Sequence, residues 1–184
     1  MKKRIILPVI FLGVAAALLA GCASLKPPKP QIRQAEFPYT LTYEIDGEEK
    51  TAEGTIQCEF DGYEQPTSAG WYRKWKVSLT NGDNVSEDDS ALITLLDLRG
   101  KGVYDDLGNE VTKLYFFGGN GHYYMGDDLG HFDRAAQNFD EICYAYKTGD
   151  GKIGYSAYPA DKAYEQFGIR LTGWEAAEPV ENTF

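Results

Sequence analysis

The chain has few of the residues and motifs on which most enzyme chemistry depends. Its 184 residues include 2 histidines and 3 cysteines. No phosphate-binding loop, dinucleotide fingerprint or CxxC pair occurs, so nucleotide, redox and haem cofactors have no support. Ser156 lies in a Gly-Tyr-Ser-Ala-Tyr stretch that lacks the second glycine of a nucleophile elbow, and no histidine follows it. The sequence therefore predicts no cofactor and no catalytic residue.

Positive charge is also scarce. Lysine and arginine number 18 against 28 aspartates and glutamates, which gives a formal net charge of -10. Such a surface repels phosphate backbones and anionic lipid headgroups. We therefore expect no nucleic-acid partner.

The beginning of the chain has the three parts of an export signal. Lys2, Lys3 and Arg4 precede an apolar run over residues 5–20, and small residues lead up to Cys22. The run has 16 residues and contains a proline, whereas a membrane-spanning helix needs about 20 residues. Residues 1–21 are therefore predicted to be a cleavable signal peptide and not a membrane anchor.

The four residues Leu19-Ala20-Gly21-Cys22 resemble the lipobox of bacterial lipoproteins. The resemblance implies that the chain is cut before Cys22 and that this cysteine carries a diacylglyceryl group and usually an amide-linked acyl chain. Two or three acyl chains form a durable anchor, whereas one binds only marginally. Cleavage takes the formal charge from -10 to -13, because three basic and no acidic residues are lost. We expect a protein held by lipid on the extracytoplasmic face of the cell membrane, with its acidic body standing off the bilayer.

Residues 22–35 contain Lys26-Pro27-Pro28-Lys29-Pro30 and have no apolar period. This composition is typical of a semi-rigid tether, which at roughly 3.1 Å per residue could lift the domain about 40 Å from the bilayer. Residues 36–184 are enough for one domain with a real core. We predict a lipidated tether followed by a single β-rich domain.

The domain alternates apolar and polar residues with a period of two from Phe37 onward, as a half-buried strand does. Asp46-Gly47, Asp61-Gly62 and residues 148–151 are turn signals. Arg73 falls on the apolar side of its strand, where we expect it to snorkel or to lie at the rim. About nine strands are predicted, over residues 37–45, 48–60, 71–80, 91–98, 110–117, 122–125, 140–147, 152–158 and 169–174.

One helix is predicted, over residues 159–167. Pro159 can occupy its first turn, and Gly168 can cap its end. Many short strands with a single late helix indicate an all-β fold, mainly an antiparallel sandwich or flattened barrel.

Cys58 and Cys143 both lie in predicted strands. An exported protein can form a disulfide, so the two cysteines are a possible pair. The alternative is that they are two small buried apolar side chains on neighbouring strands.

Residues 118–133 form the most unusual segment, because they combine five glycines with both histidines. The rings of Tyr123 and Tyr124 could stack on sugar rings, while Asp127 and Asp128 bond sugar hydroxyls. The alternatives are core packing for the rings and tight turns for the aspartates. The segment also offers side chains that could bind zinc or calcium: His122, Asp127, Asp128, His131 and Asp133.

Four stretches of the chain resemble a group of short, uncharacterised surface lipoproteins of Gram-positive bacteria of the Firmicutes type. They are residues 36–48, 58–62, 123–127 and 167–175. The resemblance supports the compartment and implies no activity, ligand or catalytic residue.

The favoured hypothesis is a membrane-anchored, non-catalytic binding or interaction module. Its partner would be a cell-wall glycan or another surface protein. The alternative is a carboxylate- or metal-dependent hydrolase that acts at the cell surface, since acidic residues abound.

Overall fold

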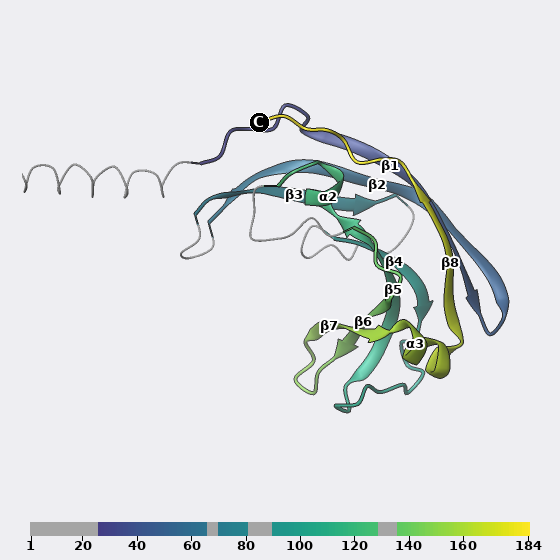
Figure 1. The fold of residues 1–184 in the computed structure, drawn as a ribbon. Coiled ribbons are helices and arrows are strands. Elements are labelled where there is room, and N and C mark those ends of the chain that lie inside the picture. The colour runs from purple at the N-terminus through teal and green to yellow at the C-terminus, as the bar shows by residue number, and fades with distance from the viewer. Residues whose placement is uncertain (1–25, 66–69, 81–89, 129–135) are drawn as a thin grey trace, which may run out of the picture.

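The described part of the chain folds into two four-stranded antiparallel sheets that pack as a sandwich (Figure 1). The computed structural model describes residues 26–65, 70–80, 90–128 and 136–184. The predicted signal peptide and Cys22 lie outside this described part. The predicted fold class is confirmed as an open sandwich and not a closed barrel, because the two sheets have separate strand orders.

The first sheet has the strand order β3-β2-β1-β8. The inner strand β1 pairs with β2 on one side and with β8 on the other. The alternation that predicted β1 holds, because Phe37, Tyr39, Leu41 and Tyr43 are all buried. The strands are β1 (Gln34–Ile45), β2 (Glu48–Glu64), β3 (Tyr72–Leu79) and β8 (Ile169–Ala176).

The second sheet has the order β4-β5-β6-β7, so each strand pairs with its neighbour in sequence. Its strands are β4 (Ser90–Asp97), β5 (Glu110–Asn120), β6 (Glu141–Lys147) and β7 (Ile153–Pro159). Two helices, α2 (Gly121–Tyr124) and α3 (Ala160–Phe167), follow β5 and β7 directly. The predicted C-terminal helix is confirmed as α3, and Gly168 ends it in the left-handed conformation, with φ 64°.

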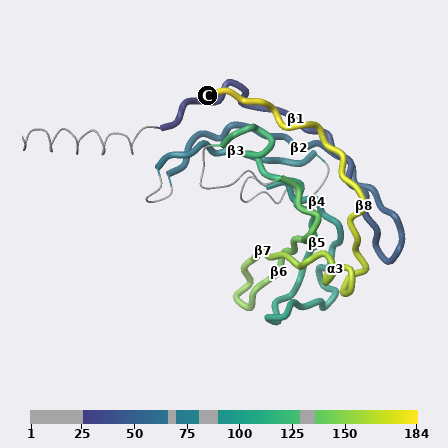
Figure 2. The backbone as a smooth tube through the Cα atoms, viewed as in Figure 1, coloured from purple at the N-terminus to yellow at the C-terminus, as the bar shows by residue number. Residues whose placement is uncertain are grey.

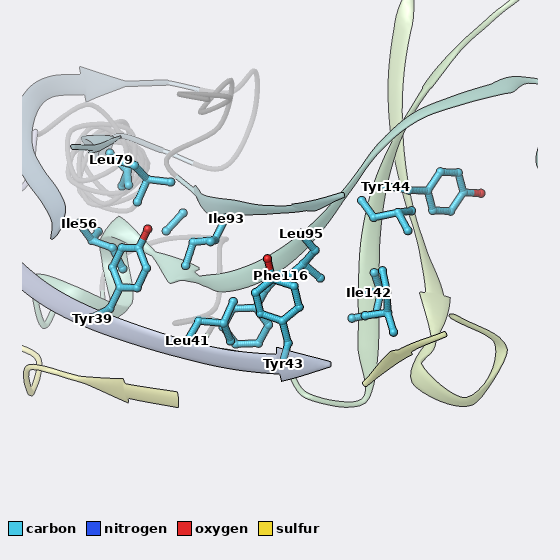
Figure 3. Close-up of a cluster of buried hydrophobic side chains, with 14 of the residues drawn as sticks. Tyr39, Leu41, Tyr43, Ile56, Leu79, Ile93, Leu95, Phe116, Ile142 and Tyr144 are labelled. Atoms are coloured by element: carbon cyan, nitrogen blue, oxygen red, sulfur yellow. The ribbon is translucent and has the colours of Figure 1, made fainter. Parts of the chain in front are cut away.

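The core lies between the two sheets. Figure 3 shows Tyr39, Leu41 and Tyr43 of β1 on the side of the strand that faces Ile93, Leu95 and Phe116 of the second sheet. These side chains come from alternating positions of the strands, as packing between two sheets requires. The core therefore fixes the face that each strand presents.

The turns follow the predicted chemistry with one exception. Asp46 and Gly47 both have positive φ, 53° and 80°, as a two-residue hairpin demands. Residues 148–151 connect β6 to β7 as predicted. The prediction that Asp61-Gly62 ends its strand is wrong, because β2 continues to Glu64 across a register shift. Gly62, with φ 91°, makes a bulge there and not a turn.

The strand predicted over residues 122–125 is also wrong, since this segment is the helix α2 and the described chain has eight strands. Asn120 caps the helix by accepting a hydrogen bond from the Tyr123 backbone N–H at 2.8 Å. Gly121 lets α2 approach β3 closely, because a Cβ there would lie 2.7 Å from the Cβ of Trp75. The short helix is thus set by a cap and a close contact, and not by an apolar period.

The predicted tether contacts the domain at several of the residues that the structure describes. Pro30 is buried, and the Gln31 backbone N–H donates to the Thr183 carbonyl at 3.2 Å. The Asn182 side chain accepts from the Ile32 N–H at 3.0 Å and donates to the Ile32 carbonyl at 2.8 Å. The tether and the C-terminal segment therefore run side by side (Figure 2). The expectation of a semi-rigid spacer is wrong for residues 28–32, because Arg73 bonds the Pro28 carbonyl and the C-terminal segment bonds the backbone of Gln31 and Ile32.

Cys58 and Cys143 are not joined by a disulfide. Cys58 lies on β2 of the first sheet and Cys143 on β6 of the second, so they are not on hydrogen-bonded neighbouring strands. Burial raises the pKa of the Cys143 thiol to about 11, so it is protonated at neutral pH. The pairing of β2 with β6 that a bridge could have indicated does not occur.

Candidate functional site

A buried ion pair joins β3 to the segment after α2. The Arg73 Nε donates to Asp127 Oδ2 at 2.8 Å, and Nη2 donates to Oδ1 at 2.7 Å. The indole Nε1–H of Trp75 donates to the same Oδ2 at 2.9 Å. Both charged side chains are fully buried. The prediction that Arg73 snorkels or lies at the rim of the sheet is wrong, because its side chain is fully buried and Asp127 supplies a matching bidentate partner inside.

The same arginine also holds both terminal segments. Its Nη1 donates to the Pro28 carbonyl at 3.0 Å, and its Cζ lies 3.7 Å from the ring centroid of Phe184. Three hydrogen bonds and a ring face therefore occupy the guanidinium. A buried charge is costly unless it is paired and hydrogen-bonded in this way. The network therefore has a structural role: it links β3, the segment after α2 and the two terminal segments.

His122 lies beside this network, with its Nδ1 3.8 Å from Asp127 Oδ2. Burial lowers the pKa of His122, and the Arg73 charge adds to that effect while the Asp127 charge opposes it. Desolvation is the largest of these causes, so the imidazole is neutral at neutral pH.

The described candidate metal ligands do not converge on one point. His122 and Asp127 are buried together, but Asp127 is already occupied by Arg73 and Trp75, and Asp128 is exposed. His131 and Asp133 lie outside the described residues. Within the described ranges, no three His, Cys, Asp or Glu side chains gather as metal ligands would.

The other side of α2 lines a pocket of about 300 Å³. Its far wall is the chain that leaves β8, which two backbone hydrogen bonds hold in place. The Ala177 N–H donates to the Pro38 carbonyl at 3.1 Å, and the Val180 N–H donates to the Tyr124 carbonyl at 2.9 Å. The pocket is lined by Tyr123, Tyr124, Gln137, Trp174, Glu175, Ala176, Ala177, Glu178 and Pro179.

The aromatic rings of the pocket are fixed by their neighbours. Tyr124 is buried, its hydroxyl donates to the Gly118 carbonyl at 2.5 Å, and burial raises its pKa. Tyr123 is half-buried and packs edge-to-face on Tyr124, with centroids 5.1 Å apart. Trp174 is half-buried and stacks on Tyr39 at 5.2 Å. Tyr123 and Trp174 are therefore preformed aromatic surfaces in the lining of the pocket.

The structure brings together only some of the predicted site residues. Tyr123 and Tyr124 line the pocket as expected of a binding platform, whereas Asp127 points into the ion pair and Asp128 is not part of the lining. Sequence reasoning missed the pocket's other polar and aromatic residues, because no local pattern places them beside α2. They are Gln137, Trp174, Glu175 and Glu178.

Comparison with protein-family models, with curated proteins and with solved structures finds no significant match to this chain. Among the helices of residues 26–184 that the structure describes, none is long and apolar enough to cross a membrane.

Proposed function

We propose that the chain is a lipoprotein, anchored through Cys22 on the outer face of the cell membrane, that binds a cell-wall saccharide without turning it over. The basic start, the short apolar run and the Leu-Ala-Gly-Cys sequence support the location. The resemblance to surface lipoproteins supports the same compartment. The observation that carries the binding function is the pocket between α2 and the end of β8.

The lining of this pocket suits a sugar. Half-buried Tyr123 and Trp174 offer ring faces and edges to the apolar side of a pyranose. Glu175, Glu178 and the Gln137 carboxamide offer acceptors and donors for hydroxyl groups. A volume of about 300 Å³ is at the small end for a ligand site, which fits one or two sugar rings and not a long chain.

The charge of the pocket narrows the ligand further. Two carboxylates line it, and no lysine or arginine does so in the part of the chain that is described. A phosphate- or sulfate-bearing polymer would meet repulsion there. Neutral or amine-bearing glycans are therefore favoured over anionic ones.

Binding is tested with the full chain carrying Cys22→Ser, so that it stays in solution, on an array of cell-wall glycan fragments. We expect neutral or amine-bearing fragments to bind and Tyr123→Ala to weaken that binding at least about tenfold, or about 1.4 kcal/mol. Tyr155→Ala is the matched control, since this partly exposed tyrosine lies on β7 and not in the pocket. Equal binding by the two variants, or no binding by the parent, would refute the proposal.

Location is tested separately by fractionating cells that express the native chain or Cys22→Ala. The native chain should sediment with membranes, while the variant should be released. Retention of the variant on membranes would refute lipid anchoring at Cys22.

One observation favours the hydrolase as a second candidate: two carboxyl groups, of Glu175 and Glu178, line the same pocket. Carboxyl pairs are the working groups of most glycosidases. The same fragments should therefore be followed for cleavage. Turnover that is lost in both Glu175→Gln and Glu178→Gln would assign the pocket to catalysis, and binding without turnover would assign it to recognition.

A further inference from the structure

The docking of the tether fixes how far the domain can stand from its anchor. Lys26, the first described residue of the tether, contacts the domain. Its Nζ lies 4.4 Å from the Trp71 ring centroid and 5.4 Å from that of Tyr63. Pro28 is held by Arg73, and Ile32 by Asn182. The contacts run from one end of the described tether to the other, so the tether is a part of the folded domain.

Only residues 23–25 separate Cys22 from Lys26. A fully extended chain covers about 3.3 to 3.6 Å per residue, so these four steps span at most about 14 Å. An undocked tether of residues 22–35 would allow about 40 Å at roughly 3.1 Å per residue. Docking therefore removes most of the distance between the domain and the lipid on Cys22.

The end of the first sheet that Lys26 contacts carries side chains that are typical of a membrane interface. Tyr63, at the end of β2, and Trp71, just before β3, are both half-buried, and the exposed Lys26 lies over both rings. Tryptophan and tyrosine are enriched at the headgroup level, where lysine extends its charge into water. Lys29, three residues further along the tether, is a second exposed cation. Figure 1 shows this end of β2 and β3 on the same side as the start of the tether.

We propose that the surface formed by Lys26, Tyr63 and Trp71 rests on the lipid headgroups of the membrane that holds Cys22. This inference rests on the proposed lipidation of Cys22. It replaces the expectation that the acidic body stands off the bilayer, because the short connection to Cys22 keeps this end near the lipid and Lys26 lies over two aromatic rings there, although the exposed Glu64 lies next to Tyr63. The domain is then held in one orientation, with the surface formed by Lys26, Tyr63 and Trp71 facing the bilayer.

The test is quenching of tryptophan emission by brominated phospholipids in vesicles that carry the lipidated full chain. Trp71 is one of 3 tryptophans, so quenching should remove up to about a third of the emission. Trp71→Phe should abolish this loss. Trp174→Phe should keep it, because Trp174 lies in the pocket on the other side of α2.

A flexible Gly-Ser linker of about 20 residues inserted after Ser24 should also reduce the quenching, because it adds about 25 Å of average reach. A chain that stays bound to the vesicles without quenching, or with quenching that Trp71→Phe leaves unchanged, would overturn this inference alone. Failure of the native chain to associate with membranes would overturn both this inference and the proposed location.

Discussion

The two sides of α2 differ in what they do with polar groups. On the side facing β3, Asp127 is fully buried and bonded to Arg73 and Trp75. On the side facing the end of β8, the rings of Tyr123 and Trp174 and nearby carboxylates remain accessible around a pocket. A satisfied, buried network stabilises one structure and has nothing left to offer a ligand. The open side has unused hydrogen-bonding capacity, so recognition is assigned there.

Removing Arg73 should have the largest effect on stability. Arg73→Met leaves the Asp127 carboxylate buried without its cation, which we expect to cost about 3 to 5 kcal/mol in urea unfolding. Lys74→Met is the control on the neighbouring position. Its 3.2 Å pair with Asp61 is half-exposed, so the cost should stay below about 1 kcal/mol.

The double variant Arg73→Met with Asp127→Leu distinguishes an unpaired charge from lost packing. It should recover a large part of the stability, because no charge is then buried. If Arg73→Met lowered the free energy of unfolding no more than Lys74→Met does, the buried network would not stabilise the fold.

Gly121→Ala should be the next largest effect, because it pushes α2 away from β3. The added methyl would lie 2.7 Å from the Cβ of Trp75, on a strand that cannot easily yield. We expect a loss of about 1 to 3 kcal/mol by urea unfolding. Gly149→Ala, whose added Cβ meets open space, should change stability little. Equal effects of the two alanines would contradict the close packing of α2.

Tyr123→Ala should affect the open side with little effect on folding. The ring is half-buried and loses one edge-to-face contact with Tyr124, so we expect a cost of about 1 kcal/mol in thermal or urea unfolding. Glycan binding should fall far more than this stability change would explain. A variant that unfolds, or one that binds normally, would remove Tyr123 from the site.

The smallest expected effect is a pH dependence that arises from His122. Burial depresses its pKa in the folded state, so the unfolded chain binds a proton that the folded chain does not. The contribution to stability is therefore complete above about pH 6.5 and is lost as the pH falls from there toward the lower folded pKa.

Unfolding free energies measured between pH 7.5 and pH 5.5 should decline, and His122→Gln should flatten the decline. A decline of the same slope in His122→Gln would assign the pH dependence to other groups.

The sequence was informative wherever one local rule decided the outcome. The alternation of apolar and polar residues predicted β1. The Asp46-Gly47 pair, whose residues accept positive φ, predicted the turn, and Gly168 predicted the end of α3. It failed where contacts distant in sequence decided. Arg73 on an apolar parity is the signal of a buried partner, but nothing local shows that the partner is Asp127, 54 residues away.

The candidate site shows the same division. Tyr123 and Tyr124 could be singled out from the sequence, because they lie in the segment of residues 118–133 that combines five glycines with both histidines. Trp174, Glu175 and Glu178 could not, because they reach the pocket only through the pairing of β8 with β1 and the two hydrogen bonds that follow it. The docked tether was missed for a related reason: its proline content describes its stiffness and not its contacts.

The indole N–H resonances of the full Cys22→Ser chain test the contrast between the two sides most directly. They are assigned with Trp71→Phe, Trp75→Phe and Trp174→Phe, and are followed while cell-wall glycan fragments are added. The Trp174 signal should shift with saturation, because this ring lines the pocket, while the Trp75 signal should stay in place because its N–H is donated to Asp127. A shift at Trp75 with none at Trp174, or no shift with any fragment, would contradict the account.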